Sequence, residues 1–224
     1  MLRGLFVTGT DTGVGKTVAA AALVIRYRRR VPAAAVKYWK PIQTGIEQDD
    51  DTAEVARLAA CGSNEIVNAG VRLERPVSPH LAARLAGRPI DLEGLVAIAG
   101  REPDSARLIV EGAGGVLVPV NENAFMADLV ARLALPAVVV SRTALGTINH
   151  TLLTIQALRG RAIEVAGVIM VGAPNDDNRE AIERYGNVDV LGVMPRFDPL
   201  TPDRLAAWAG AELDLRGRLE PLLR

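Results

Sequence analysis

The sequence predicts a single-domain α/β fold of three layers, with a mostly parallel sheet flanked by helices. Two observations support this prediction. Continuous apolar runs, which suit strands buried on both faces, alternate along the chain with helical patterns. Such alternation implies right-handed crossovers between parallel strands. A chain of 224 residues is long enough for one domain with a substantial core and too short for two of ordinary size, so we expect residues 1–224 to form one domain.

The apolar runs and helical patterns give the expected elements. Strands are predicted at residues 2–7, 33–38, 106–110, 137–141, 165–171 and 188–194. Helices are predicted at residues 17–30, 52–60, 80–86, 92–99, 127–133, 147–158 and 178–185, and the chain after residue 203 is helical in composition. A basic cluster ends the first helix, where it suits the helix dipole, and we expect it to be solvated; its members are Arg26, Arg28, Arg29 and Arg30.

A glycine loop joins the first predicted strand to the first predicted helix. It reads Gly9-Thr10-Asp11-Thr12-Gly13-Val14-Gly15-Lys16-Thr17. Its glycines permit positive φ, so several N–H groups can face one anion at the helix N-terminus. Lys16 adds a mobile cation for phosphates, and the Thr17 hydroxyl is placed to bind Mg²⁺. The pattern is a P-loop that is one residue longer than the standard form. A glycine-rich turn with an incidental Lys-Thr pair would not require the strand before it and the helix after it.

Charged residues follow two other predicted strands, at the edge where open parallel sheets bind ligands. Lys40 is expected near the phosphates, although a lysine before a turn proline can also be a surface residue. Asp49, Asp50 and Asp51 precede a helix, so Asp50 or Asp51 can cap the helix or bind Mg²⁺. Glu111 ends an apolar strand beside the P-loop strand, where it can hold Mg²⁺ directly or through water. The glycines after Glu111 allow a substrate to approach the backbone closely.

The composition favours small molecules as partners. The 26 basic and 26 acidic side chains balance, so we expect no nucleic acid and no membrane partner. A single cysteine, Cys61, excludes an internal disulfide and fits a reducing compartment, for which the cytoplasm is the expectation. The sequence shows neither a leader segment nor an apolar run of the roughly 18 residues that a membrane span needs.

Taken together, the motifs resemble the dethiobiotin synthetase family. They occur in the family's order and comprise the P-loop, Lys40-Pro41 with Thr44-Gly45, Asp49 to Asp51, Ser78-Pro79-His80, Val110-Glu111-Gly112-Ala113-Gly114-Gly115 and Leu145-Gly146-Thr147-Ile148-Asn149-His150. The resemblance implies a homodimeric enzyme of biotin synthesis that uses ATP and Mg²⁺. It would close the ureido ring of dethiobiotin from 7,8-diaminononanoate and CO₂, through a carbamate and a carbamic-phosphoric anhydride.

The resemblance also implies residue roles. The Mg²⁺ ligands would be Thr17, Asp51 and Glu111, with Asp51 chosen from three adjacent aspartates. The catalytic residues would be Lys16, Lys40 and Thr12. The nucleotide site would comprise Gly13, Val14, Gly15, Lys16, Thr17, Val18, Asp51, Glu111, Gly112, Ala113, Gly114, Val171, Gly172, Pro195, Arg196 and Phe197. The substrate site would comprise Thr12, Lys40, Thr44, Gly114, Thr147 and Asn149.

One of these assignments depends on a second subunit, and another falls where this sequence departs from the family's usual residues. The helix that starts near Thr147 resembles the family's dimer-contacting segment, whose N-terminal amides receive the substrate carboxylate from the other subunit. Val171 and Gly172 stand where better-known members often have Asn and Asp, so the base is expected to be read differently.

Two rival functions share parts of this pattern. A ParA/MinD-like switch ATPase has the long P-loop but carries a lysine early in the loop, where this chain has Asp11. A glutamine-dependent amide synthase of the cobyrinate kind needs a further domain with a nucleophilic cysteine, which Cys61 does not provide. His80 and His150 are assigned no proton transfer.

Overall fold

The computed structural model, which describes residues 2–30 and 35–223, confirms the α/β prediction. The main sheet contains β1 (Gly4–Gly9), β2 (Ala35–Trp39), β4 (Ile66–Val67), β6 (Ala106–Gly115), β7 (Ala137–Arg142), β8 (Val165–Val171) and β9 (Val190–Met194). Their order is β4-β2-β6-β1-β7-β8-β9, and the ladders between them are parallel. A small parallel sheet pairs β3 (Ile42–Thr44) with β5 (Val71–Leu73).

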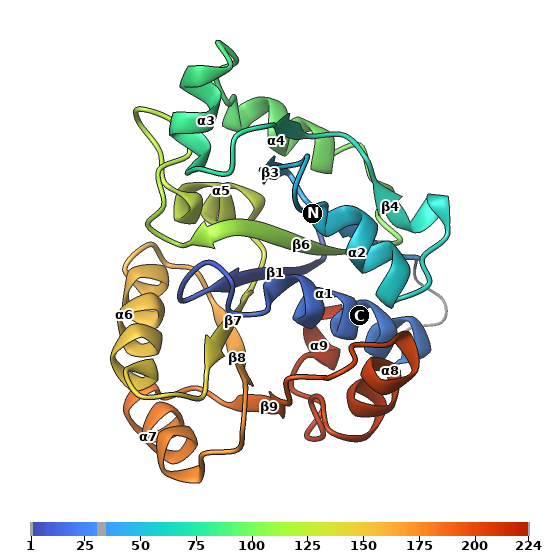
Figure 1. Cartoon of the computed structure of the whole chain (residues 1–224), viewed down its shortest axis with the longest axis vertical. Helices are drawn as coiled ribbons and strands as arrows, with labels where there is room; N and C mark the ends of the chain where they lie inside the picture. The colour runs from blue at the N-terminus through green and yellow to red at the C-terminus, as the bar shows by residue number, and fades with distance from the viewer. Residues whose placement is uncertain (1, 31–34, 224) are drawn as a thin grey trace.

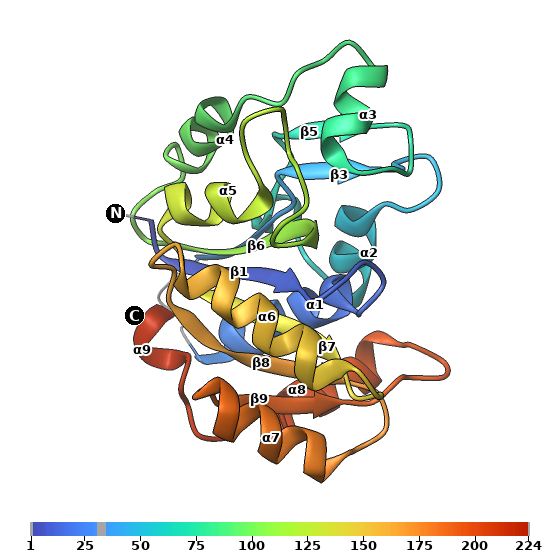
Figure 2. The same cartoon turned by 90° about the vertical axis from the view of Figure 1, so that its left-hand side faces the viewer.

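Helices cover both faces of the main sheet (Figure 1). The helices on one face are α1 (Lys16–Arg30), α2 (Asp51–Leu58), α8 (Pro202–Ala211) and α9 (Glu220–Leu223). The other face is covered by α4 (Leu92–Ala99), α5 (Met126–Leu133), α6 (Thr147–Arg159) and α7 (Asp176–Gly186), with α3 (Pro79–Leu85) beside the small sheet. Figure 2 shows α6 lying along β7 and β8. Within the described ranges, no helix is long and apolar enough to cross a membrane.

Most predicted elements occur within a few residues of their expected bounds. The predicted strand 33–38 starts within residues 31–34, which lie outside the described residues, and β2 is described from Ala35. The short strands β3, β4 and β5 were not predicted, because two or three residues show no periodicity. The strand predicted to end at residue 110 continues to Gly115, because β6 goes on pairing with β1 at Glu111 and Gly115 after its ladder with β2 has ended at Val110.

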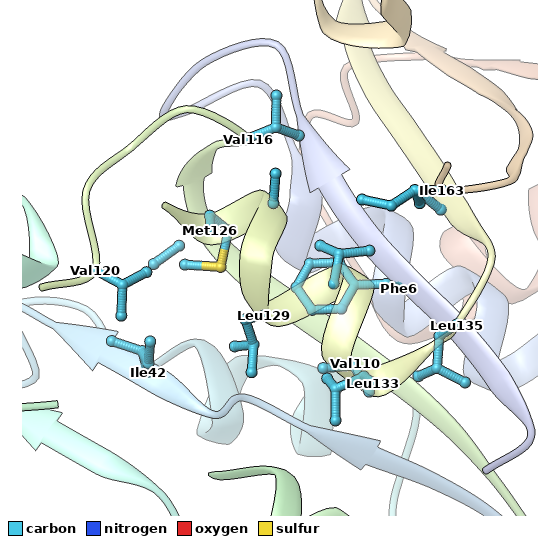
Figure 3. Packing of buried hydrophobic residues seen from close by; sticks show 14 of the residues in the cluster. Phe6, Ile42, Val110, Val116, Val120, Met126, Leu129, Leu133, Leu135 and Ile163 are labelled. Atoms are coloured by element: carbon cyan, nitrogen blue, oxygen red, sulfur yellow. The ribbon is translucent and has the colours of Figure 1, made fainter. Parts of the chain in front are cut away.

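Alternation along the central strands divides the core between the two faces. Leu5 and Val7 of β1 pack in the cluster beneath α1, whereas Phe6 packs in the cluster on the opposite face. Figure 3 shows Phe6 pointing toward α5, where Met126 and Leu129 pack. All six residues of β1 are buried, as expected for a parallel strand covered on both faces.

The strand order decides where the functional residues meet. The chain visits β1 and β2 first, but β6 later inserts between them. The carboxyl ends of these parallel strands therefore share one edge, which brings the glycine loop after β1, Lys40 after β2 and Glu111 of β6 together.

The basic cluster at the end of α1 is less solvated than expected. Arg26 is only 5% exposed, and its guanidinium donates to the carbonyl oxygens of Gly210 at 2.9 Å and Asp214 at 3.1 Å. Arg28 forms an ion pair with Glu65 at 2.7 Å. The expectation of a solvated cluster is therefore wrong for Arg26, because the C-terminal segment folds back over α1.

Asp214 fixes that segment to α1. Its buried carboxylate accepts hydrogen bonds from the Tyr27 hydroxyl at 3.0 Å and from the backbone N–H groups of Arg218 at 2.8 Å and Leu219 at 3.1 Å. Asp214 also has a φ of +50°, a left-handed conformation that Asp and Asn tolerate better than other side chains.

We expect Asp214→Asn to lower the free energy of unfolding by about 1–3 kcal/mol. The amide keeps the shape and the left-handed preference, but its NH₂ group cannot accept from donors that now face both carboxylate oxygens. Urea denaturation of the variant beside the wild type measures the difference. An unchanged midpoint and slope would show that these bonds do not hold the C-terminal segment.

Candidate active site

A cleft of about 600 Å³ opens at the carboxyl ends of β1, β2 and β6. Its walls come from the glycine loop and the start of α1, the segment between β2 and α2, residues 76–79, and the glycine-rich end of β6. Most of the sequence-predicted site residues therefore meet at one place. Those that line this cleft are Thr12, Gly13, Gly15, Lys16, Thr17, Val18, Lys40, Thr44, Asp51, Glu111, Ala113 and Gly114.

The glycine loop bends around Lys16. This lysine is 7% exposed, and its Nζ donates to the carbonyl oxygen of Asp11 at 2.8 Å. Burial, assisted by the charge of Lys40, lowers the pKa of Lys16 to about 8. Gly15 has a φ of +99°, and a Cβ there would lie 3.3 Å from Val171, so glycine suits both the backbone and the packing.

Lys40 lies between two carboxylates. It is 3% exposed, and its Nζ is 2.6 Å from Asp51 Oδ2 and 2.7 Å from Glu111 Oε1. Thr17 Oγ1 is 2.7 Å from Asp51 Oδ1 and 3.1 Å from Glu111 Oε1. The hydroxyl and both carboxylates thus face one point, where the ammonium group of Lys40 lies. Lys40 is not a surface lysine.

The charges in this cluster stabilise one another. Burial acts to lower the pKa of Lys40, but the charges of Glu111 and Asp51 outweigh it, so the pKa is raised above its ordinary value. Burial likewise acts to raise the pKa of Asp51, but the charge of Lys40 outweighs burial and the pKa is lowered. The ion pair therefore stays charged at neutral pH.

The three aspartates of the cluster make different contacts. Asp50 caps α2, because its side chain accepts from the backbone N–H of Ala53 at 3.0 Å. Asp51 is the first helical residue and faces Thr17 and Lys40 instead. Asp49 lines the cleft, and its carbonyl oxygen accepts from Gln43 Nε2 at 3.0 Å. The capping interpretation is thus confirmed for Asp50, and Mg²⁺ binding by Asp51 stays a prediction.

The oxygen set at this point fits Mg²⁺. Hydroxyl and carboxylate oxygens are the ligands that Mg²⁺ prefers, and it is often bound through one or two carboxylates together with substrate phosphates. The ammonium group of Lys40 shows that the cluster accommodates a cation. In the described ranges, no group of three or more His, Cys, Asp or Glu side chains has the arrangement of a metal site.

A second cleft of about 330 Å³ adjoins the first and shares Gly13, Gly15 and Val18 with it. Its remaining lining is mainly apolar, with two arginines: Val14, Arg142, Val171, Met194, Pro195, Arg196, Phe197 and Leu200. Gly172, predicted in the nucleotide site, lines neither of these two clefts; it has a φ of +140°, and a Cβ there would lie 2.3 Å from Thr143 Oγ1. The residues predicted to surround the base therefore offer apolar surface next to the glycine loop.

Two predicted substrate residues lie outside the cleft of their own chain. Thr147 is buried at the start of α6, where its hydroxyl donates to the carbonyl oxygen of Arg142 at 2.5 Å. Asn149 is exposed two residues further along α6. Their assignment depends on a second subunit and stays a prediction. Gly112, predicted in the nucleotide site, contributes its carbonyl oxygen to Lys40 Nζ at 3.2 Å.

Sequence reasoning missed several residues of the site. The Tyr38 hydroxyl donates to Glu111 Oε2 at 2.8 Å, and burial, followed by the charge of Glu111, raises the pKa of Tyr38 well above its usual range. Arg142 donates to the carbonyl oxygen of Thr12 at 3.3 Å and so supports the glycine loop from β7. The sequence did contain a signal for Tyr38. It precedes Lys40 by two residues, and strand alternation places both side chains on one face.

Comparisons with known proteins agree with this geometry. Residues 3–204 match a family model described as an AAA domain. The chain is 48% identical over 205 residues to the ATP-dependent dethiobiotin synthetase BioD of Paramagnetospirillum magneticum, covering 92% of this chain and 94% of that protein. It is 46% identical over 201 residues to the protein of that name from Brucella ovis, covering 90% of each.

Among solved structures, the chain is similar to the septum site-determining protein MinD with Mg-ADP from Pyrococcus horikoshii. The TM-score is 0.57 at 14% identity, with 92% of this chain and 86% of that chain covered. At this identity the likeness concerns the fold alone.

The cost of burying a charged Lys16 leads to a prediction about stability. The pKa of Lys16 falls from 10.5 to about 8 on folding, so its charge destabilises the ligand-free protein fully below pH 8 and no longer above pH 10.5. A pKa difference of one unit corresponds to about 1.4 kcal/mol of stability. The hydrogen bond from Lys16 to the carbonyl oxygen of Asp11 offsets part of this cost. We therefore expect Lys16→Met to raise the free energy of unfolding at pH 7 by about 1–3 kcal/mol, and the gain to shrink at pH 10.

Urea denaturation of wild type and Lys16→Met at both pH values, without nucleotide, measures this gain. A variant less stable than the wild type at pH 7 would mean that Lys16 contributes favourably to the fold.

Proposed function

The chain belongs to the ATP-dependent dethiobiotin synthetase family, ligases of biotin biosynthesis, and we propose that it closes the ureido ring of dethiobiotin from 7,8-diaminononanoate and CO₂. The observation that carries the chemistry is the buried contact of Lys40 with Asp51 and Glu111 beside the glycine loop. This arrangement collects cations and oxygen ligands around a phosphate site and contains no protein nucleophile. Such a site transfers a phosphoryl group by positioning and charge neutralisation.

The glycine loop would bind the ATP phosphates. The loop and the N-terminus of α1 line the cleft, and Lys16 can exchange the Asp11 carbonyl for a phosphate oxygen. We assign Thr17, Asp51 and Glu111 to hold Mg²⁺, which when bound offsets negative charge on the phosphate oxygens. The apolar cleft beside Val171 and Phe197 would receive the base.

The reaction would proceed in three steps on the substrate. One amine of the diamine adds to CO₂ and loses a proton, forming a carbamate that Thr12 and Lys40 orient. A carbamate oxygen attacks the γ-phosphorus in line, and ADP leaves. The second amine then attacks the carbamoyl carbon of this mixed anhydride, phosphate leaves, and the ring closes. Thr44 and the backbone of Gly114 line the cleft where the diamine would lie.

We further propose a homodimer in which α6 of one subunit meets the cleft of the other. The N-terminus of α6, with Thr147 and Asn149, would receive the substrate carboxylate. Leu145 and Leu153 flank this region and are exposed, which supports contact with a second copy. Residues 1–224 would act as one domain in the cytoplasm, where Cys61 stays reduced.

Release of phosphate from ATP tests the overall function. We expect release to require both the diamine and bicarbonate. Lys40→Ala should lower kcat by about 10²–10³, because Lys40 would neutralise charge that develops during transfer. Lys37→Ala is the matched control, since Lys37 lies on β2, three residues before Lys40, but pairs with Glu102. Stimulation by DNA or by lipid vesicles, without need for the diamine, would favour the MinD-like switch.

Transfer of oxygen from bicarbonate to phosphate tests the mixed anhydride. If a carbamate oxygen attacks phosphorus, that oxygen leaves with the released phosphate. Bicarbonate labelled with ¹⁸O, used before it exchanges with water, should therefore put at most one labelled atom into each phosphate. Mass spectrometry of the phosphate reads the label. Unlabelled phosphate beside labelled dethiobiotin, with exchange controlled, would rule out a phosphorylated carbamate.

Nucleotide selectivity is expected to be loose. Val171 offers no hydrogen bond to a base edge, and apolar pockets discriminate by about 10²-fold at most, far less than pockets that bond a substrate group. The kcat/KM values for ATP, GTP and CTP should therefore differ by less than about 10²-fold. Val171→Asn, which introduces the group often found in the family, should increase the preference for ATP. Strict use of ATP by the wild type would show that backbone groups read the adenine.

A further inference from the structure

The two oxygens of Glu111 face different partners. Glu111 is fully buried, and its Oε1 faces Thr17 and Lys40, the cation site. Its Oε2 accepts a hydrogen bond from the Tyr38 hydroxyl at 2.8 Å. Over residues 2–30 and 35–223, Tyr38 is the one side chain seen to donate to Oε2. The carboxylate plane is thus fixed from both ends.

Tyr38 is held in place more firmly than a surface residue would be. It lies on β2 two residues before Lys40, so strand alternation directs both side chains to the same face of the sheet. The register pairs Tyr38 with Ile109 and Trp39 with Val110, the last pair of this ladder, so Lys40 and Glu111 follow directly beside each other. The ring is fully buried in the cluster that contains Val55 and Leu58 of α2.

We propose that Tyr38 is a positioning residue for the cation site, because its hydroxyl holds Glu111 in the rotation that presents Oε1 to Thr17 and Lys40. This inference rests on the proposed function in one respect, the assignment of Glu111 as a Mg²⁺ ligand. Without the hydroxyl, Oε2 would lack a donor in buried surroundings, and the carboxylate would turn to seek one. Residues that orient metal ligands in this way change metal affinity about 10–100-fold when they are replaced.

The chain offers a matched control in Tyr27. Tyr27 is also fully buried, and its hydroxyl also donates to a buried carboxylate, that of Asp214 at 3.0 Å, away from the cleft. Tyr27→Phe and Tyr38→Phe therefore remove the same kind of bond. We expect comparable losses in thermal stability from the two variants, whereas only Tyr38→Phe should affect the cation site.

Binding of Mn²⁺ to the protein–ADP complex, followed by the electron paramagnetic resonance of free Mn²⁺, provides a readout apart from activity. Tyr38→Phe should weaken Mn²⁺ binding about tenfold or more, while Tyr27→Phe leaves it unchanged. In turnover, Tyr38→Phe should raise the half-saturating Mg²⁺ concentration without changing the KM of the diamine. Equal Mn²⁺ affinity of Tyr38→Phe and wild type would overturn the inference.

A double-mutant cycle with Glu111→Gln separates this inference from the proposed function. If Tyr38 acts through Glu111, adding Tyr38→Phe to Glu111→Gln should change Mn²⁺ affinity little further. Fully additive effects would refute a role through Glu111 and leave the proposed function intact. If Glu111→Gln itself leaves Mn²⁺ affinity unchanged, the assignment of Glu111 as a ligand fails, and the inference fails with it.

A second measurement does not depend on whether Tyr38→Phe folds. The chain contains three tyrosines, so uniform labelling with 3-fluorotyrosine gives three ¹⁹F signals. Tyr27→Phe and Tyr185→Phe assign two of them, and the third is Tyr38. Addition of Mg²⁺ to the ADP complex should shift the Tyr38 signal and leave the other two in place. A Tyr38 signal that stays fixed while Mg²⁺ binds would contradict the inference.

Discussion

A carboxylate buried in the middle of the sheet is the constraint on which the site depends. Glu111 has no contact with solvent, and an isolated buried charge would cost several kcal/mol. Its three partners come from two other segments: Tyr38 and Lys40 from the end of β2, and Thr17 from α1. The fold must therefore bring these segments to β6 if the carboxylate of Glu111 is to be buried with partners. The polar cluster depends on the order of the central strands, and that order is stable only because the cluster compensates the buried carboxylate.

The two lysines of the cleft, Lys16 and Lys40, have pKa values shifted in opposite directions. Lys40 has two carboxylates at contact distance, and its pKa rises despite complete burial. Lys16 lacks such a contact; its Nζ meets only a backbone carbonyl, and its pKa falls. Lys16, the lysine without a carboxylate at contact distance, is the one in the glycine loop. A phosphate that enters the loop would supply the missing countercharge, so part of its affinity comes from relieving a cost already present in the folded protein.

The sequence was most informative where chemistry and periodicity coincide. Continuous apolar runs predicted the central strands, and the glycine loop predicted Lys16 and Thr17 at the start of a helix. The sequence could not show that β6 lies between β1 and β2, because strand order depends on packing between distant segments. Tyr38 was missed for a related reason: its partner, Glu111, is 73 positions away. Arg26 was misjudged because the chain that covers it comes at the other end of the sequence.

The crowded backbone at Gly172 also restricts how this nucleotide site can change over generations. A side chain at position 172 would meet Thr143 Oγ1 and would require a φ that only glycine adopts freely. The acidic residue that better-known relatives often carry there would thus be strained in this backbone unless Thr143 moved as well. A base bound in the adjoining cleft would therefore meet Val171 and its neighbours, and a side chain at position 172 would not contribute to reading it.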